Sequence, residues 1–289
     1  MAIQPIYRQY DRAELNAQYN NRARVPDHEQ HGARWSRESA AARREVRCQL
    51  ELGYGPTPPE RVDVFHADSP NAPALMWIHG GYWMSRDKSD FSFMARPLVA
   101  AGVTVVMVNY ALAPHVTVTE IVRQNRDAGN WLWRNASKLG VDRGRLFVGG
   151  HSAGGHLTAM LLTTDWRKFD RQLPLHLFRG GIALSGVYDL EPIRLCYLNE
   201  TLHMDESEVK LISPLFNLPE SAPPLLAVVG GAESEEFLRQ NEAIATAWSS
   251  RGWSSQSIIC PDKDHFTVLG QIVEPGNPLI SAMLALVRR

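Results

Sequence analysis

The sequence is poor in cysteine, in charge of one sign and in long apolar runs, and each shortage excludes a class of protein. The three cysteines, Cys48, Cys196 and Cys260, are scattered, so they predict neither a disulfide framework nor a zinc site. With 30 basic and 31 acidic side chains, the net charge of -1 offers nucleic acid no basic surface. No apolar run reaches the length of a membrane span, and the polar start of the chain lacks the apolar core of a secretory signal. We therefore expect a cytoplasmic protein with no nucleic-acid or membrane partner.

The 289 residues, of which 44% are hydrophobic, suffice for a sizeable core, and we predict a single domain over 1–289. Short apolar runs alternate with helical stretches, as in a mostly parallel, doubly wound sheet with helices on both faces. The predicted strands are 62–66, 75–79, 103–109, 146–149, 181–184, 225–229 and 257–260. The predicted helices are 34–51, 91–101, 118–139, 153–164 and 235–251. This alternation predicts the α/β class.

Two stretches interrupt the alternation, and we interpret them as a small cap. The first, residues 1–59, is rich in Arg, Gln, Asn and Glu and ends in a break of glycines and prolines. The second, residues 188–216, shows no clear strand. We expect both stretches to cover the edge of the sheet where its parallel strands end, because ligands bind at that edge in α/β proteins.

The strongest chemical signal is the run Gly150-His151-Ser152-Ala153-Gly154, which fits the pattern G-x-S-x-G. The run lies between a predicted strand and an apolar helix, which is the setting that a nucleophile elbow requires. The turn is so tight that glycines flank it, and it lifts the serine hydroxyl clear of the sheet. The helix N-terminus that follows favours a developing anion. Ser152 is therefore the predicted nucleophile.

A second motif, His79-Gly80-Gly81-Tyr82-Trp83, comes at the end of the predicted strand 75–79. Its glycines allow backbone N–H groups to point into a site that Cβ atoms would otherwise crowd, and such donors stabilise the oxyanion of a tetrahedral intermediate. The predicted donors are the N–H groups of Gly81, Tyr82 and Ala153. We expect Gly80 to shape the turn and His79 to hydrogen-bond the loop backbone.

In α/β-hydrolases the chain order of the triad is the nucleophile, then the acid, then the histidine base. His265 lies just past the last predicted strand, where a neutral imidazole can accept the serine proton. Glu233 comes first in the loop after the preceding strand, so we assign it as the acid that orients His265. Asp264 and Glu236 stay open as alternatives.

No motif predicts a metal or another cofactor. His28 and His31 are three residues apart, but no partner cluster accompanies them, so we expect them in a solvated loop. No G-x-G-x-x-G run follows the first strand of the sheet, which argues against a dinucleotide.

The motifs together resemble those of the hormone-sensitive-lipase branch of the α/β-hydrolases, and within it the kynurenine formamidases (arylformamidases). The runs that carry the resemblance are His79–Trp83, Asn109–Pro114, Gly150–Gly154, Ser185–Leu190, Glu233–Gln240 and Asp264–Phe266. Two positions depart from the pattern: Glu233 stands where the family commonly has Asp, and Ala111 stands where the wider branch has Arg.

The resemblance implies a serine hydrolase that removes a small acyl group, formyl or acetyl, from an aryl amide or ester through an acyl-enzyme. The substrate it implies is an aryl formamide such as N-formylkynurenine. A carboxylesterase acting on small esters would use the same triad, and a non-catalytic binding protein of this fold is the alternative from another class. A homodimer stays open.

Aromatic residues near the motifs suggest a pocket for a flat ring, by stacking and burial of apolar area. We expect Tyr82, Trp83 and Tyr188 to bind the substrate, with Phe91, Phe93 and Tyr197 as further candidates.

Overall fold

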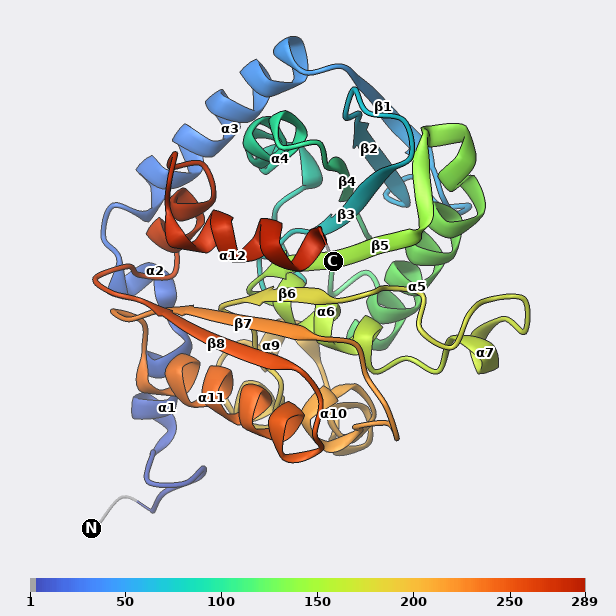
Figure 1. Ribbon diagram of the computed structural model, residues 1–289. Coiled ribbons are helices and arrows are strands. Elements are labelled where there is room, and N and C mark those ends of the chain that lie inside the picture. The colour runs from blue at the N-terminus through green and yellow to red at the C-terminus, as the bar shows by residue number, and fades with distance from the viewer. Residues whose placement is uncertain (1–3, 289) are drawn as a thin grey trace.

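The centre of the protein is one eight-stranded sheet, seen edge-on in a computed structural model that describes residues 4–288 (Figure 1). The strands are β1 (Cys48–Gly53), β2 (Arg61–Phe65), β3 (Ala72–Ile78), β4 (Thr104–Val108), β5 (Val141–His151), β6 (Gly181–Leu184), β7 (Leu225–Gly230) and β8 (Ser255–Cys260). Their order in the sheet is β1-β2-β4-β3-β5-β6-β7-β8. β2 is antiparallel to both its neighbours, and all other pairs are parallel, which confirms the predicted mostly parallel sheet.

Helices cover both faces of the sheet, as predicted. In Figure 1, α3, α4 and α12 lie over one face, and α5, α6 and α11 lie over the other. The α-helices are α1 (Arg12–Tyr19), α2 (Asn21–Arg24), α3 (His28–Glu45), α4 (Ala95–Ala100), α5 (Val118–Asn135), α6 (Ala153–Leu162), α7 (Trp166–Phe169), α8 (Glu191–Leu195), α9 (Asn199–Leu202), α10 (Glu206–Ile212), α11 (Glu235–Ser250) and α12 (Pro278–Val287). Short 3-10 turns are η1 (Lys88–Asp90), η2 (Ser92–Met94), η3 (Ala136–Leu139), η4 (Pro214–Phe216) and η5 (Thr267–Ile272). No helix among residues 4–288 is both long enough and apolar enough to cross a membrane.

The middle strands are buried on both faces, which explains their continuous apolar sequences. Every residue of β3 and of β7 is buried. Side chains of one face pack against α5, α6 and α11, and those of the other face pack against α3, α4 and α12. The protein therefore has two hydrophobic cores, one on each face of the sheet. The apolar runs of the strands are the feature from which the sequence predicted the sheet.

One predicted element is wrong. We expected a helix over residues 34–51, but α3 ends at Glu45 and residues Cys48–Gly53 form β1. Gln, Leu and Glu have good helix propensity, so local sequence favoured the helix. Pairing with β2, where Cys48 lies opposite Phe65, overrides that weak preference. The first cap stretch therefore ends near residue 45 and not near residue 59.

The two cap stretches meet each other above the sheet edge. α1 contacts α8 and α11, and the backbone N–H of Tyr197 donates to Asn16 Oδ1 at 2.8 Å. Between residues 188 and 216 the chain forms α8, α9, α10 and η4, with no strand, as expected. The two predicted cap stretches are thus in contact, although they lie far apart in the sequence.

A buried polar cluster fixes the N-terminal segment to α11. Tyr19 is fully buried, and its hydroxyl donates to Glu236 Oε2 at 2.9 Å. Arg239 binds both oxygens of Glu236 at 2.8 Å, and Tyr7 donates to Asp189 at 2.7 Å. Burying a charged group without a partner costs free energy. These bonds therefore favour one position of the N-terminal segment against α11.

We predict that Tyr19→Phe lowers the free energy of unfolding by about 1–2 kcal/mol, because a buried carboxylate loses a donor. Tyr10→Phe is the matched control: its hydroxyl donates to Glu235 at 2.9 Å, but Glu235 is exposed and regains water. That variant should lose no more than about 0.5 kcal/mol. Urea unfolding of both variants measures the difference, and equal losses would contradict this account of the cluster.

Candidate active site

Ser152 stands at a sharp turn between β5 and α6. Its φ of 58° and ψ of -118° lie outside the regions that L residues normally adopt, so the turn is strained. A Cβ on Gly150 would lie 2.3 Å from the oxygen of Gly154, and a Cβ on Gly154 would lie 2.0 Å from the oxygen of Ile78. Only glycine fits at either position, which is the geometry that the G-x-S-x-G run predicts.

The loop after β3 packs directly against this turn. A Cβ on Gly80 would lie 3.0 Å from Ser152 Cβ and 2.8 Å from the oxygen of His151. Gly81, Tyr82 and Trp83 all have positive φ, at 112°, 49° and 59°. The loop therefore curls tightly beside the nucleophile instead of running on as a strand.

Three backbone donors remain free beside Ser152. Among residues 4–288, the N–H groups of Gly81, Tyr82 and Ala153 make no hydrogen bond to the protein. Ala153 is the first residue of α6, so its N–H also lies at the positive end of a helix dipole. Free N–H groups close to a serine hydroxyl are what an oxyanion requires.

His265 and Glu233 form a hydrogen-bonded pair. His265 Nδ1 donates to Glu233 Oε2 at 2.7 Å, which leaves Nε2 as the basic nitrogen. Glu233 Oε1 accepts from the Ser185 hydroxyl at 2.5 Å and from the Gly230 N–H at 2.8 Å. The side chains of Ser185, Glu233 and His265 are all buried, so the hydrogen bonds to Glu233 replace those that water would make to its carboxyl group.

The two alternative acids have other partners. Asp264 Oδ1 accepts the N–H groups of Phe266 and Thr267 at 2.7 and 2.9 Å, so it caps the turn that carries His265. Glu236 binds Tyr19 and Arg239 in the cluster that holds the N-terminal segment. Of the three carboxylates, only that of Glu233 contacts the imidazole.

Two further histidines lie beside the site and serve its shape. His79 Nδ1 bonds the oxygen of Gly80 at 2.8 Å, and its ring stacks on Tyr110 at 4.2 Å. His151 Nε2 bonds the backbone oxygen of His265 at 2.9 Å. Burial lowers the pKa of His79, and burial together with the charge of His265 holds the pKa of His151 well below its usual range. Both imidazoles are therefore neutral.

A cavity of about 530 Å³ opens above Ser152. His151, Ser152, Gly80 and Gly81 lie at its base, together with His265. Its walls come from the cap and the neighbouring loops, and consist of Asn20, Asn21, Arg22, Trp35, Tyr82, Met84, Ser85, Arg86, Phe91, Tyr197, Leu198 and Phe266. The rings in this wall give the cavity an apolar, flat lining suited to an aromatic group.

The structure corrects part of the predicted substrate pocket. Tyr82 lines the cavity, but Trp83 and Tyr188 are fully buried outside it. The positive φ angles of the loop turn Trp83 inward, edge-on against His156 of α6 at 5.1 Å. A Cβ on Gly186 would lie 2.5 Å from the Tyr188 hydroxyl, so that ring packs against its own loop.

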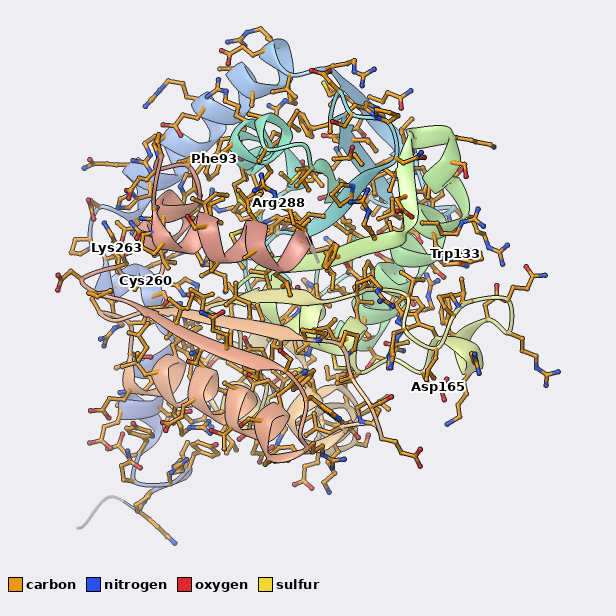
Figure 2. The ribbon with its side chains drawn as sticks, viewed as in Figure 1. Phe93, Trp133, Asp165, Cys260, Lys263 and Arg288 are labelled. Carbon is orange, nitrogen blue, oxygen red and sulfur yellow. The ribbon has the colours of Figure 1, made fainter. Side chains whose placement is uncertain are left out.

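Of the further aromatic candidates, Phe91 and Tyr197 line the cavity and Phe93 does not. Figure 2 shows Phe93 beside α4. Phe93 is buried, and its ring stacks on Trp35 of α3 at 6.4 Å. Trp35 itself lines the cavity and also stacks on Phe266 at 6.0 Å. The sequence analysis missed Trp35 because its contact with the site depends on how α3 is placed.

Ser185 is a second residue that the motifs did not reveal. It follows β6 with a φ of 50°, and its hydroxyl donates to Glu233. The signal was present in the sequence, since a serine directly after a central strand falls at the same sheet edge as the elbow.

No group of three or more His, Cys, Asp or Glu side chains within residues 4–288 is arranged to hold a metal ion. Instead of lying in the expected solvated loop, His28 and His31 lie in the first turn of α3. Both rings lie against Phe266, at 5.8 and 6.3 Å.

The same architecture recurs in proteins of known description. Residues 62–246 match the family BD-FAE, a stretch that spans the elbow, the oxyanion loop and the acid loop. The chain belongs to the BD-FAE family. This family assignment agrees with the α/β-hydrolase fold, because the structural neighbours of the protein are α/β-hydrolases.

Individual relatives of this BD-FAE protein cover nearly its whole length. Kynurenine formamidase of Danio rerio is 31% identical and covers 85% of this chain and 84% of its own. Kynurenine formamidase of Salmo salar is 34% identical and covers 82% of this chain and 81% of its own. The crystal structure of a candidate thioesterase from Silicibacter sp. TM1040 superimposes with a TM-score of 0.83 at 28% identity, over 96% of this chain and 99% of that one.

His156 ties the nucleophile helix to the cap. It is fully buried in α6, and its Nε2 donates to the oxygen of Ile212 in α10 at 2.7 Å. Burial lowers its pKa from 6.5 to about 4. The unfolded chain therefore binds a proton between these pH values that the folded protein does not, so stability falls as the pH falls through this window.

The free energy of unfolding of the wild type should fall between pH 7 and pH 5. We predict that this fall is about 2 kcal/mol smaller in His156→Gln. The matched control is His115→Gln, whose exposed ring is solvated in both states. Urea unfolding at the two pH values measures the loss for each variant. If the free energy of unfolding of His156→Gln falls as much as that of the wild type, His156 is not the source of the pH dependence.

Proposed function

We propose that this hydrolase removes a small acyl group, formyl or acetyl, from an aryl amide or ester, with Ser152, His265 and Glu233 as its triad. The observation that carries the proposal is the hydrogen bond between the carboxylate of Glu233 and the imidazole of His265. His265 and Ser152 both line the same cavity, whose wall contains aromatic rings. Kynurenine formamidase relatives over most of the chain support the acyl class.

In the first half of the reaction, Ser152 Oγ attacks the carbonyl carbon and His265 Nε2 takes the hydroxyl proton. Glu233 stabilises the imidazolium that forms, and Ser185 and the Gly230 N–H keep the carboxylate in place. The tetrahedral intermediate then collapses, and the imidazolium returns the proton to the leaving nitrogen or oxygen. The products are a free arylamine or phenol and an ester of Ser152.

In the second half, water replaces the leaving group. His265 takes a proton from the water, the hydroxide attacks the acyl ester, and the serine leaves with the proton. In both halves the carbonyl oxygen becomes an anion, which the free N–H groups of Gly81, Tyr82 and Ala153 are placed to bind. The glutamate in place of aspartate keeps the charge and reaches the imidazole at 2.7 Å.

The carboxylesterase alternative uses the same groups, and the relative Esterase LipC of Mycobacterium tuberculosis, 29% identical over 62% of this chain, favours it. The two functions differ in the leaving group that the enzyme tolerates. An amide nitrogen must be protonated as it leaves, whereas a phenolate leaves readily. The comparison of an aryl formamide with the matching aryl formate therefore separates them.

We predict that Ser152→Ala reduces kcat to below about a hundredth of the wild-type value while the protein stays folded.

Glu233→Gln should lower kcat about a hundredfold or more with little change in KM, because the imidazolium loses its partner. Glu235→Gln is the matched control, since Glu235 is exposed and does not contact His265. Near-normal turnover by either triad variant would remove that residue from the mechanism.

We predict that kcat/KM falls along the formyl, acetyl, butyryl and octanoyl esters of one phenol, because Tyr82 and its loop lie directly beside Ser152. The corresponding formanilide and N-formylkynurenine are measured beside the esters. A profile that rises toward octanoyl would overturn the small-acyl proposal. Formamides that stay intact while short esters are cleaved would assign the enzyme to the carboxylesterases.

A further inference from the structure

The charges around the cavity are all of one sign. Among residues 4–288, two arginines line it, Arg22 and Arg86, and no aspartate or glutamate does. Its remaining ionisable wall groups are histidines and tyrosines. His151 is neutral because burial lowers its pKa. A bound molecule therefore contacts two arginines and no carboxylate of the lining, although the Asp90 carboxylate lies behind Arg86 at 3.9 Å.

Arg86 is held in place above an aromatic wall. Its guanidinium lies 5.8 Å from the centre of the Trp35 ring, and it touches the backbone of α3, because a Cβ on Gly32 would lie 2.9 Å from Arg86 Nη2. The nearest carboxylate is that of Asp90, at 3.9 Å, which is beyond hydrogen-bonding distance. Asp90 already accepts the Ser36 hydroxyl at 2.8 Å. The guanidinium thus keeps free donors, and its packing lowers the entropy cost of using them.

Arg22 approaches the same cavity from the cap. It lies on α2, next to Asn21, whose amide donates to the Tyr82 hydroxyl at 3.2 Å. Tyr82 in turn donates to the oxygen of Tyr19 at 2.8 Å, so this part of the wall is fixed to the oxyanion loop. Arg22 makes no hydrogen bond or ion pair with any of the residues 4–288. An arginine with no internal partner at the rim of a pocket is available to a ligand.

We propose that the leaving group of the substrate is an aromatic ring that carries a carboxylate and no ammonium group, and that Arg22 and Arg86 bind that carboxylate. The inference deepens the proposed function, because it rests on acyl transfer at Ser152. Trp35, Phe91 and Phe266 supply the surface for the ring, and the arginines supply donors that match a carboxylate. A zwitterion would place its ammonium group in a wall with no carboxylate to receive it.

Aryl acetates that differ in a single charged group test the proposal. They are 3-acetoxybenzoate, its neutral isostere 3-acetoxybenzamide and the cationic 3-(aminomethyl)phenyl acetate, each with its 4-substituted isomer. We expect kcat/KM to be about tenfold or more higher for the carboxylate than for the amide, and lowest for the cation. The difference should lie in KM and should shrink at high ionic strength, as for any exposed charge.

Variants locate the effect. Arg22→Gln and Arg86→Gln should each reduce the carboxylate-to-amide ratio several-fold, and the double variant should bring it close to one. Arg24→Gln is the matched control: Arg24 lies on the same short helix α2, is exposed and does not line the cavity, so the ratio should stay at the wild-type value. Thermal unfolding of each variant establishes that it is folded.

The outcomes for the subsite and for the reaction are distinguishable. Hydrolysis of all three charge types with equal kcat/KM, or a ratio that the double variant leaves unchanged, would overturn the carboxylate subsite and leave the proposed hydrolase intact. If neither these acetates nor the corresponding formates are hydrolysed, the proposed function fails, and calorimetric binding of 3-acetoxybenzoate to Ser152→Ala still tests the subsite. Binding of the carboxylate no tighter than that of the amide would refute it.

Discussion

The site depends on one close approach between two pieces of backbone. The elbow after β5 lies against the end of β3, so that Gly154 leaves no room for a Cβ beside the oxygen of Ile78. The parallel register that sets Ile78 opposite Gly150 brings the two loops to the same point. This approach places Ser152 beside the free donors of Gly81 and Tyr82 before any substrate arrives. Donors that are already in position need no reorganisation in the transition state, which is the main source of catalytic stabilisation in such sites.

Where local sequence and the sheet agree, the sequence was sufficient. The buried strands could be predicted, because a strand covered on both faces has an apolar side chain at nearly every position. The positions of Ser152 and His265 followed from chain order, since each comes directly after a strand that ends at the same edge. The sequence did not separate Glu233 from Asp264 and Glu236, because all three closely follow strands that end at the same edge of the sheet and differ in their hydrogen-bond partners.

What the sequence could not supply was the direction of side chains in irregular segments. Tyr82 and Trp83 are neighbours, yet one faces the cavity and the other is buried, because positive φ angles set their orientation. Trp35 joins the site through the placement of α3, which no local pattern encodes. The strand β1 was mistaken for helix because its pairing with β2 is a tertiary interaction that outweighs propensity.

The two-segment cap has a consequence for how such an enzyme diversifies. The reacting groups come from the ends of the strands, whereas Arg22, Trp35 and Tyr197 come from stretches inserted before and within the sheet. Part of the cavity wall is therefore encoded apart from the proposed triad, whereas Tyr82, Arg86 and Phe91 belong to the loop beside Ser152. Substitutions in residues 4–45 and 188–216 can alter this part of the cavity wall. The hydrogen bonds of Glu236 meanwhile hold the N-terminal segment in place. Libraries confined to those two segments would vary this part of the wall and leave the residues of the proposed triad unchanged.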